Sequence, residues 1–227
     1  MDIYNLAIKD AKKILIGLIT IEIFFVTIYG FTAFFDSSII VLKILFDLDN
    51  EGSLPAWFSA TQLFLIGLAF LTKSRVIDKH HSPSPYFFLI MGLGFIFLSA
   101  DEAAAIHEKM THILKNYDAM PRFRGNHGIW IFIYISIAIL LLLSHFKYLT
   151  ALWNFYRKET IILSIGMTGI ICGGVILEIV SYQFLRTGLT PISYAIEVIA
   201  EEFLEMFGAT IVLYGAIIIL LKKPNLP

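Results

Sequence analysis

Residues 192–221 read ISYAIEVIAEEFLEMFGATIVLYGAIIILL, and this stretch decides both the fold class and the place of the chemistry. It is apolar enough and long enough to cross the hydrocarbon core of a bilayer, which takes roughly 20 residues. Its first half nevertheless carries the carboxylates of Glu197, Glu201, Glu202 and Glu205. Acids inside a transmembrane helix cost so much free energy that they indicate a functional site. The stretch therefore predicts a membrane-spanning helix with chemistry in one of its halves.

The rest of the chain has the composition of a membrane protein. Of its 227 residues, 58% are hydrophobic and only 15% are charged, whereas a soluble domain carries about 25% charged residues. Six apolar runs are long enough to span, and they cover residues 13–35, 54–73, 86–108, 128–148, 160–184 and 192–221. The shorter run 37–47 predicts a helix that lies in the outer membrane interface. We therefore expect one all-α domain over residues 1–227, an integral membrane bundle of six transmembrane helices.

The positions of lysine and arginine predict the orientation of this bundle. Eleven of these residues fall on the side of the N-terminus and six on the other side. Cytoplasmic segments carry the excess of such residues, so both termini are expected in the cytoplasm. The first run is too long for the apolar part of a signal peptide, and we interpret it as a retained span. These features predict a multi-pass protein of the bacterial inner membrane, with membrane lipid as a partner.

Charge and cysteine content exclude other classes. The net charge of −1 gives no basic surface for nucleic acid. The single cysteine, Cys172, excludes an intrachain disulfide and a paired-cysteine metal site. The sequence leaves the oligomeric state open.

The acids are distributed in the opposite way to the basic residues. Thirteen of the eighteen acids fall on the predicted outer side. The lysine and arginine bias that predicts the orientation does not explain this, because acids contribute little to topology. Asp47, Asp49 and Glu51 alternate like the start of a calcium loop, but the distal Glu of that loop is missing. We interpret this segment as an acidic hairpin that caps the outer mouth of the bundle.

Helical phase sorts the remaining acids into a candidate metal site. At about 100° per residue, a straight helix places Asp101, Glu108 and His112 on one face of the third span. The same spacing places Glu201 and Glu205 on one stripe of the sixth span. The candidate metal ligands are Asp101, Glu108, His112, Glu178, Glu201 and Glu205.

The residue types indicate which chemistry such a site supports. Asp, Glu and His without thiolates favour Zn²⁺, Mn²⁺ or Fe²⁺, and one or two ions would neutralise the crowded acids. A bound ion lowers the pKa of water toward ~7, and Glu102 or Glu197 would be the general base. The first hypothesis is therefore a metal-dependent membrane enzyme that hydrolyses or oxidises a lipid-like substrate.

Two other functions use the same residues. A cation or proton transporter or channel would bind its ion at the outer acids, and Glu22 in the first span would continue the path toward the cytoplasm. An assembly or sensory subunit would use the acids to contact a partner, although a buried acidic stripe suits that role poorly.

Several candidate residues also have a plainer interpretation. Glu108 and its neighbours would be ordinary solvated loop residues if the third span ends before them. Glu202 points away from the stripe and would pair with Arg124 or Arg186. The His-Glu-x-x-x-His spacing that begins at residue 107 departs from the His-Glu-x-x-His zinc motif. The prediction therefore depends on many acids at one membrane depth rather than on a motif.

Three blocks of sequence stand out: FDLDNE at 46–51 with PAWFS at 55–59, SADE at 99–102 with HE at 107–108, and EEFLEMFG at 201–208. In these blocks the chain resembles a family of uncharacterised bacterial multispanning membrane proteins. The resemblance extends over most of the chain, from the segment before the second span to the sixth span. It implies a multi-pass membrane fold, and because the family has no assigned activity it implies no catalytic roles.

Overall fold

The computed structural model describes residues 3–35, 39–78, 83–185 and 188–222, and in these residues it is 85% helical without strands. The elements in chain order are α1 (Ile3–Phe34), α2 (Ile40–Leu45), α3 (Leu54–Val76), α4 (Pro85–Ala104), α5 (Ile106–Leu114), η1 (Arg124–Asn126), α6 (Ile129–Ser144), α7 (Phe146–Phe155), α8 (Arg157–Ile171), η2 (Cys172–Leu177), α9 (Glu178–Val180), η3 (Ser181–Leu185) and α10 (Pro191–Leu221).

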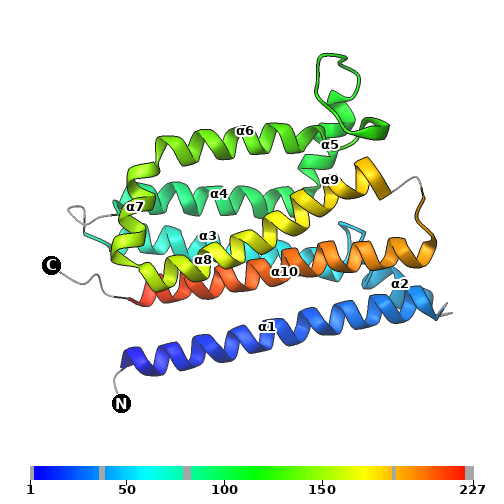
Figure 1. Ribbon diagram of the computed structural model, residues 1–227. Coiled ribbons are helices and arrows are strands. Elements are labelled where there is room, and N and C mark those ends of the chain that lie inside the picture. The colour runs from blue at the N-terminus through cyan, green and yellow to red at the C-terminus, as the bar shows by residue number, and fades with distance from the viewer. Residues whose placement is uncertain (1–2, 36–38, 79–82, 186–187, 223–227) are drawn as a thin grey trace.

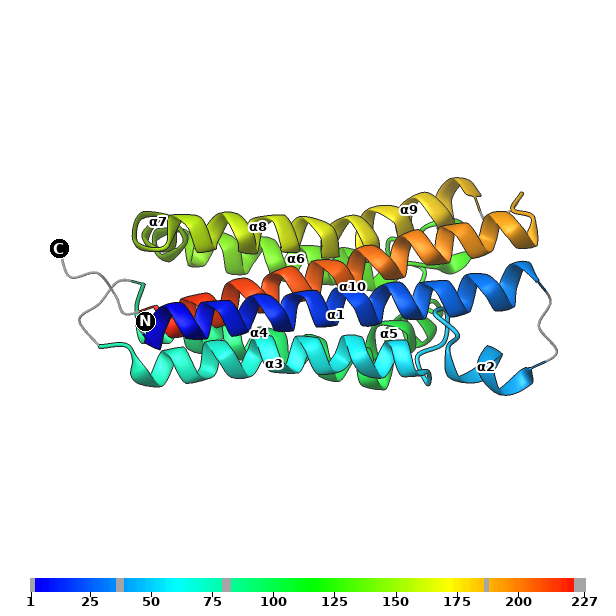
Figure 2. The same ribbon diagram turned by 90° about the horizontal axis from the view of Figure 1, so that it is seen from below.

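The long helices run side by side as a bundle (Figures 1 and 2). Five helical stretches in the described chain are long and apolar enough to cross a membrane: α1, α3, α4, α10 and the continuous stretch Arg157–Leu185. Helices α6 and α7 qualify only as a pair, bent by 68° at their junction. The fold is therefore that of a multi-pass membrane protein with five or six spans.

The two ends of the bundle differ in what they hold. Helices α2 and α5 and the start of α10 lie at one end, which we call the acidic end (Figure 1). The start of α1, the end of α10 and helix α7 lie at the other end. There, Lys222 Nζ lies 3.1 Å from both carboxylate oxygens of Glu159, and Lys73 Nζ donates to the backbone oxygen of Lys222 at 2.8 Å. These bonds hold the end of α10 against α3 and α8.

Three of the bundle helices begin in the same way. Ser53, Ser84 and Thr190 each accept a hydrogen bond from a backbone N–H in the first turn of α3, α4 and α10. Each helix also has a proline in its first turn. A proline there removes no helical hydrogen bond, and the cap satisfies one of the free N–H groups. These starts explain why the predicted boundaries at 54 and 86 agree closely with the structure.

Two predicted spans are divided in the structure. The third, predicted over 86–108, ends at Ala104, because Ala105 adopts left-handed dihedrals (φ 48°, ψ 45°) and a separate helix α5 follows. The prediction of one straight helix that carries Asp101, Glu108 and His112 on a single face is therefore wrong. The fourth, predicted over 128–148, breaks at His145.

The first predicted span and the interfacial helix agree in position with the structure but differ in extent. Helix α1 begins at Ile3 rather than at residue 13. Helix α2 covers Ile40–Leu45 of the predicted 37–47, and residues 36–38 lie outside the described residues.

Helix α10 is the central helix of the bundle, and it packs against α1, α3 and α8. Its contact with α8 is close because two glycines face each other. A Cβ atom on Gly166 would lie 2.7 Å from the backbone oxygen of Gly208, and a Cβ on Gly208 would lie 2.6 Å from that of Gly166. Small residues of this kind let membrane helices approach each other closely.

Beyond these glycines, toward the end opposite the acidic end, most of the buried side chains are apolar. A cluster of buried side chains from α3, α4, α8 and α10 fills this region and includes Phe70, Phe88, Leu163, Val212 and Ile219. We call this group the apolar cluster. It closes that half of the bundle.

Gly208→Leu should destabilise the protein, because the larger side chain has no room against the α8 backbone. Overpacking of this kind costs about 1–3 kcal/mol. The midpoint of thermal unfolding in detergent measures the effect. The control is Gly94→Ala in α4, where a Cβ would meet no atom within 4 Å. This control should unfold at or slightly above the wild-type temperature, because Ala favours a helix over Gly by up to about 1 kcal/mol. Equal midpoints for wild type and Gly208→Leu would contradict the close approach of α8 and α10.

Candidate metal site

A cavity of about 430 Å³ lies among α3, α4, α6, η2 and α10 and reaches the acidic end. Its wall carries nine carboxylates and one imidazole, and none of the described residues that line it is a lysine or arginine. The carboxylates are those of Asp49, Glu51, Asp101, Glu102, Glu108, Glu178, Glu201, Glu202 and Glu205. The sequence-based expectation that acids from several helices share one volume is therefore seen in the structure.

The break after α4 positions the imidazole of His107. The chain turns at Ala105, and the backbone N–H of His107 donates to Asp101 Oδ1 at 2.8 Å. The other carboxylate oxygen of Asp101 lies 3.3 Å from His107 Nδ1. A left-handed alanine costs about 1–2 kcal/mol, and the two interactions of Asp101 offset this cost. Asp101 thus fixes both the start of α5 and the orientation of the ring.

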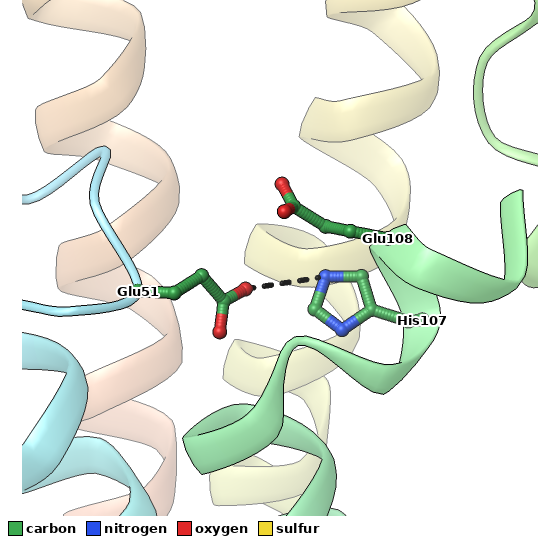
Figure 3. Close-up of side chains that lie close together, drawn as sticks. All are labelled: Glu51, His107 and Glu108. Atoms are coloured by element: carbon green, nitrogen blue, oxygen red, sulfur yellow. Dashed lines mark ion pairs between the residues drawn. The ribbon is translucent and has the colours of Figure 1, made fainter. Parts of the chain in front are cut away.

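His107, Glu51 and Glu108 form the group that could hold a metal ion. Each offers one ligand atom, and these three atoms lie within 4.8 Å of one another. Figure 3 shows that Glu51 comes from the segment before α3 and points at His107, while Glu108 follows His107 on α5. The distance from Glu51 Oε1 to His107 Nε2 is 3.6 Å.

The surroundings of this group resemble the outer shell of known metal sites. Metal-binding histidines usually place their second ring nitrogen against a carboxylate, which fixes the tautomer and the ring orientation. Asp101 occupies this position at His107 Nδ1. The indole of Trp130 lies 5.0 Å from the imidazole, ring centre to ring centre, and its Nε1 donates to Glu178 at 3.2 Å. The imidazole is therefore held from two sides, with Nε2 turned to Glu51.

The electrostatics of the group depend on burial and on its own charges. Burial alone would lower the pKa of His107, but the hydrogen bond and charge of Asp101 and the charge of Glu51 raise it to about 9. Burial raises the pKa of Glu51 to about 7, with the positive charge of His107 acting in the opposite direction. Without a metal ion, His107 is therefore protonated at neutral pH. A cation that binds Nε2 must displace that proton.

Deeper in the cavity, α10 contributes three further acids. Glu201, Glu202 and Glu205 line the wall across from α4, which contributes Glu102. A Cβ atom on Gly174 would lie 3.0 Å from Glu205 Oε1, so any larger residue would have to shift this carboxylate. Gly174 belongs to the π-helical segment η2, and such wider turns are frequent at functional sites.

The structure places the predicted site residues unequally. Those that line the cavity are Asp101, Glu102, Glu108, Glu178, Glu201 and Glu205. Glu197 is buried on α10 but does not line the cavity, and its carboxylate has no hydrogen-bond partner among the described residues. His112 lines a smaller neighbouring pocket of about 180 Å³, and its Nδ1 lies 3.0 Å from Lys115 Nζ.

Two residues of the metal-binding group were not among the predicted ligands. On a straight helix His107 would point away from the face that Asp101, Glu108 and His112 share, but the chain breaks at Ala105. The sequence predicts that Glu51 belongs to an acidic hairpin at the outer mouth of the bundle, and in the structure it lies between α2 and α3 on the wall of the cavity. The alternation of Asp47, Asp49 and Glu51 was the available signal for it. Glu202 also lines the cavity, although helical phase placed it off the stripe.

Comparison with known proteins gives a family but no activity. The chain belongs to the family defined by the domain of unknown function DUF8692, whose model matches residues 17–220. This match confirms the predicted membership of an uncharacterised family. No curated protein and no solved structure matches the chain.

Rising pH should destabilise the metal-free protein between about pH 6.5 and 9. The pKa of His107 is raised from 6.5 to about 9, so the stabilisation from its proton is complete below 6.5 and is lost as the pH rises through 9. Glu51, with its pKa raised from 4.5 to about 7, acts in the same direction but at lower pH, because its contribution is lost between about pH 4.5 and 7. The measurement is the unfolding midpoint of chelator-treated protein against pH.

His107→Gln is the matched variant for this experiment, since glutamine is polar but does not titrate. Its midpoint should change less than that of the wild type above pH 7. A wild-type midpoint that rises from pH 6.5 to 9 would contradict the arrangement of Asp101, His107 and Glu51.

Proposed function

We propose that this chain is an integral-membrane, metal-dependent enzyme whose ion is held by Glu51, His107 and Glu108. The observation that carries the proposal is the convergence of these three side chains, from two separate segments, to within 4.8 Å. Asp101 supports His107 from behind, and a cavity large enough for a small substrate opens beside the group. Sites with these features are typical of catalytic metal centres, in which protein ligands leave a position open.

The ligand types limit the choice of ion. One imidazole and two carboxylates without a thiolate suit Zn²⁺, Mn²⁺ or Fe²⁺, whereas Mg²⁺ and Ca²⁺ prefer oxygen ligands alone. The deeper acids Glu178, Glu201 and Glu205 would hold a second ion in the same cavity. His112, the other ligand suggested by the sequence, is less well placed because it faces the neighbouring pocket and Lys115.

The chemistry follows from the ion and from the acid beside it. An ion of this kind supplies Lewis acidity and lowers the pKa of bound water toward ~7. Glu102 lines the cavity one residue after Asp101, and it would accept the proton as general base. Hydrolysis of a lipid-like substrate fits this arrangement as described, whereas oxidation would need a redox-active ion such as Fe²⁺ and an external oxidant. By the distribution of lysine and arginine, the acidic end would face the outside of a bacterial inner membrane, so the substrate would come from the outer leaflet.

A cation or proton transporter is the second candidate, and one observation favours it. Glu22 is fully buried between α1, α3 and α10, where Gln62 and Thr210 donate hydrogen bonds to its Oε1. Such an intramembrane acid is typical of ion and proton paths. The apolar cluster lies between this acid and the opposite end of the bundle. The enzyme is preferred because the apolar cluster, rather than a continuous polar path, lies between Glu22 and the opposite end of the bundle.

Purified protein should contain about one or two transition-metal ions per chain, measured by plasma mass spectrometry. Glu51→Gln and Glu108→Gln should each lose one ion, because they remove a ligand oxygen while they keep the size of the side chain. Asp101→Asn should weaken ion binding by roughly 10–100-fold, as loss of an outer-shell carboxylate does.

His112→Gln is the control for this experiment, since His112 lies outside the metal-binding group. It should retain the ion. A folded wild-type preparation without stoichiometric metal would refute the metal-dependent enzyme. Loss of the ion in His112→Gln, with retention in Glu51→Gln, would instead favour the ligand set suggested by helical phase.

A further inference from the structure

The cavity has two chemically different halves. Its acidic half lies toward α5, and its other half is lined by Leu63 of α3, Leu98 of α4, Ile135, Ala138 and Ile139 of α6, and Ile170 and Ile171 of α8. These residues are all apolar. A cavity with a charged half and a hydrocarbon half fits an amphiphile better than a small polar solute.

The directions of the helices give the order of the two halves along the bundle. Helix α6 starts at the acidic end, so Trp130 lies nearer to that end than Ala138 and Ile139 (Figure 1). Helix α8 runs the other way, and Ile170 lies deeper than Glu178. At 1.5 Å per residue, the lining of α6 from 130 to 139 extends over about 14 Å. The cavity therefore continues from the metal-binding group toward the apolar cluster.

The apolar half also reaches the side of the molecule. The main backbone neighbours of helix α6 are α5 and α7. Along α6, Ile135 is 40% and Ile139 is 50% exposed, and across the cavity Ile171 is 46% exposed. In a membrane these side chains face lipid. A hydrocarbon chain can thus enter sideways from the bilayer without leaving an apolar medium.

The charge of the acidic half selects the polar head of such a ligand. Nine carboxylates line the cavity, against one histidine and no lysine or arginine among the described lining residues. Oε2 of Glu51 is buried and accepts no hydrogen bond from the described residues. Carboxylates crowded in a low dielectric are stabilised by a cation and repel an anion. A phosphate or sulfate head is therefore disfavoured on electrostatic grounds, and an ammonium head is favoured.

We propose that the cavity binds a single-chain amphiphile with a positively charged head, with the head among the carboxylates of α10 and the chain between α6 and α8. This inference rests on the proposed function in one respect, because it names the substrate class of that same cavity. The chain adds little affinity relative to free lipid, since both surroundings are apolar. It sets the orientation, and it brings the head to the metal-binding group.

The test compares two probes with the same chain and opposite charge, hexadecylamine and hexadecyl sulfate. The protein is held in nanodiscs of zwitterionic lipid at neutral pH. Trp57→Phe and Trp153→Phe, at two exposed positions, leave Trp130 at the cavity as the only tryptophan. Its fluorescence should change saturably with the amine. The sulfate should bind at least about tenfold more weakly, because like charges oppose it.

A pair of variants on α6 tests the place of the chain. Ala138→Phe fills the apolar half and should weaken amine binding by about tenfold or more, as overfilling of a packed site does. Ile137→Phe is the matched control, since this position is 50% exposed and does not line the cavity. It should bind as the wild type does. If Ala138→Phe does not fold, Ala138→Leu makes the same test with a smaller side chain.

The outcomes separate this inference from the proposed function. Equal binding of amine and sulfate would overturn the charged head, and unchanged binding in the position 138 variants would overturn the chain site. The metal content of the same preparation is measured independently. Amine binding without stoichiometric metal would support the amphiphile site and refute the metal enzyme. Stoichiometric metal without amine binding would refute the amphiphile site and support the metal enzyme.

Discussion

The burial of many carboxylates in a medium of low dielectric constant is the constraint on which the rest of this structure depends. Nine of them share one cavity. Like charges so close together cannot all ionise unless cations or protons balance them. Within the described chain, the compensating group that lies among them is His107, held by Asp101 and Glu51. This imbalance makes the acidic end a place for cations, and both proposals for its function follow from it.

The central helix α10 joins this site to the stability of the bundle. Its first half supplies three of the cavity acids, and its second half supplies the backbone contact at Gly208 and much of the apolar cluster. The two glycine contacts have different roles. At Gly166 the missing side chain brings α8 close to α10, and at Gly174 it leaves room for the carboxylate of Glu205. Packing and chemistry therefore depend on the same pair of helices.

Much of this architecture could be predicted from the sequence, because hydrophobic length and helix-start signals are local. The predicted spans overlap the helical stretches of the structure, and the acids of the third and sixth spans do meet in one cavity. The metal-binding group could not be predicted in the same way. Helical phase assumes a straight helix, and the left-handed turn at Ala105 rotates His107 and Glu108 relative to Asp101. Glu51 lies on an irregular segment whose path depends on tertiary contacts rather than on any periodic pattern.

Anomalous diffraction from crystals of metal-loaded protein tests the central claim most directly. Data collected above and below the absorption edge of zinc, manganese or iron locate the bound ion without reference to any assumed activity. We expect a peak within coordination distance of Glu51, His107 and Glu108, which is ~2.0–2.2 Å for zinc. A strong peak elsewhere, such as beside His112 in the smaller pocket, or no peak in crystals whose loading has been verified, would contradict it.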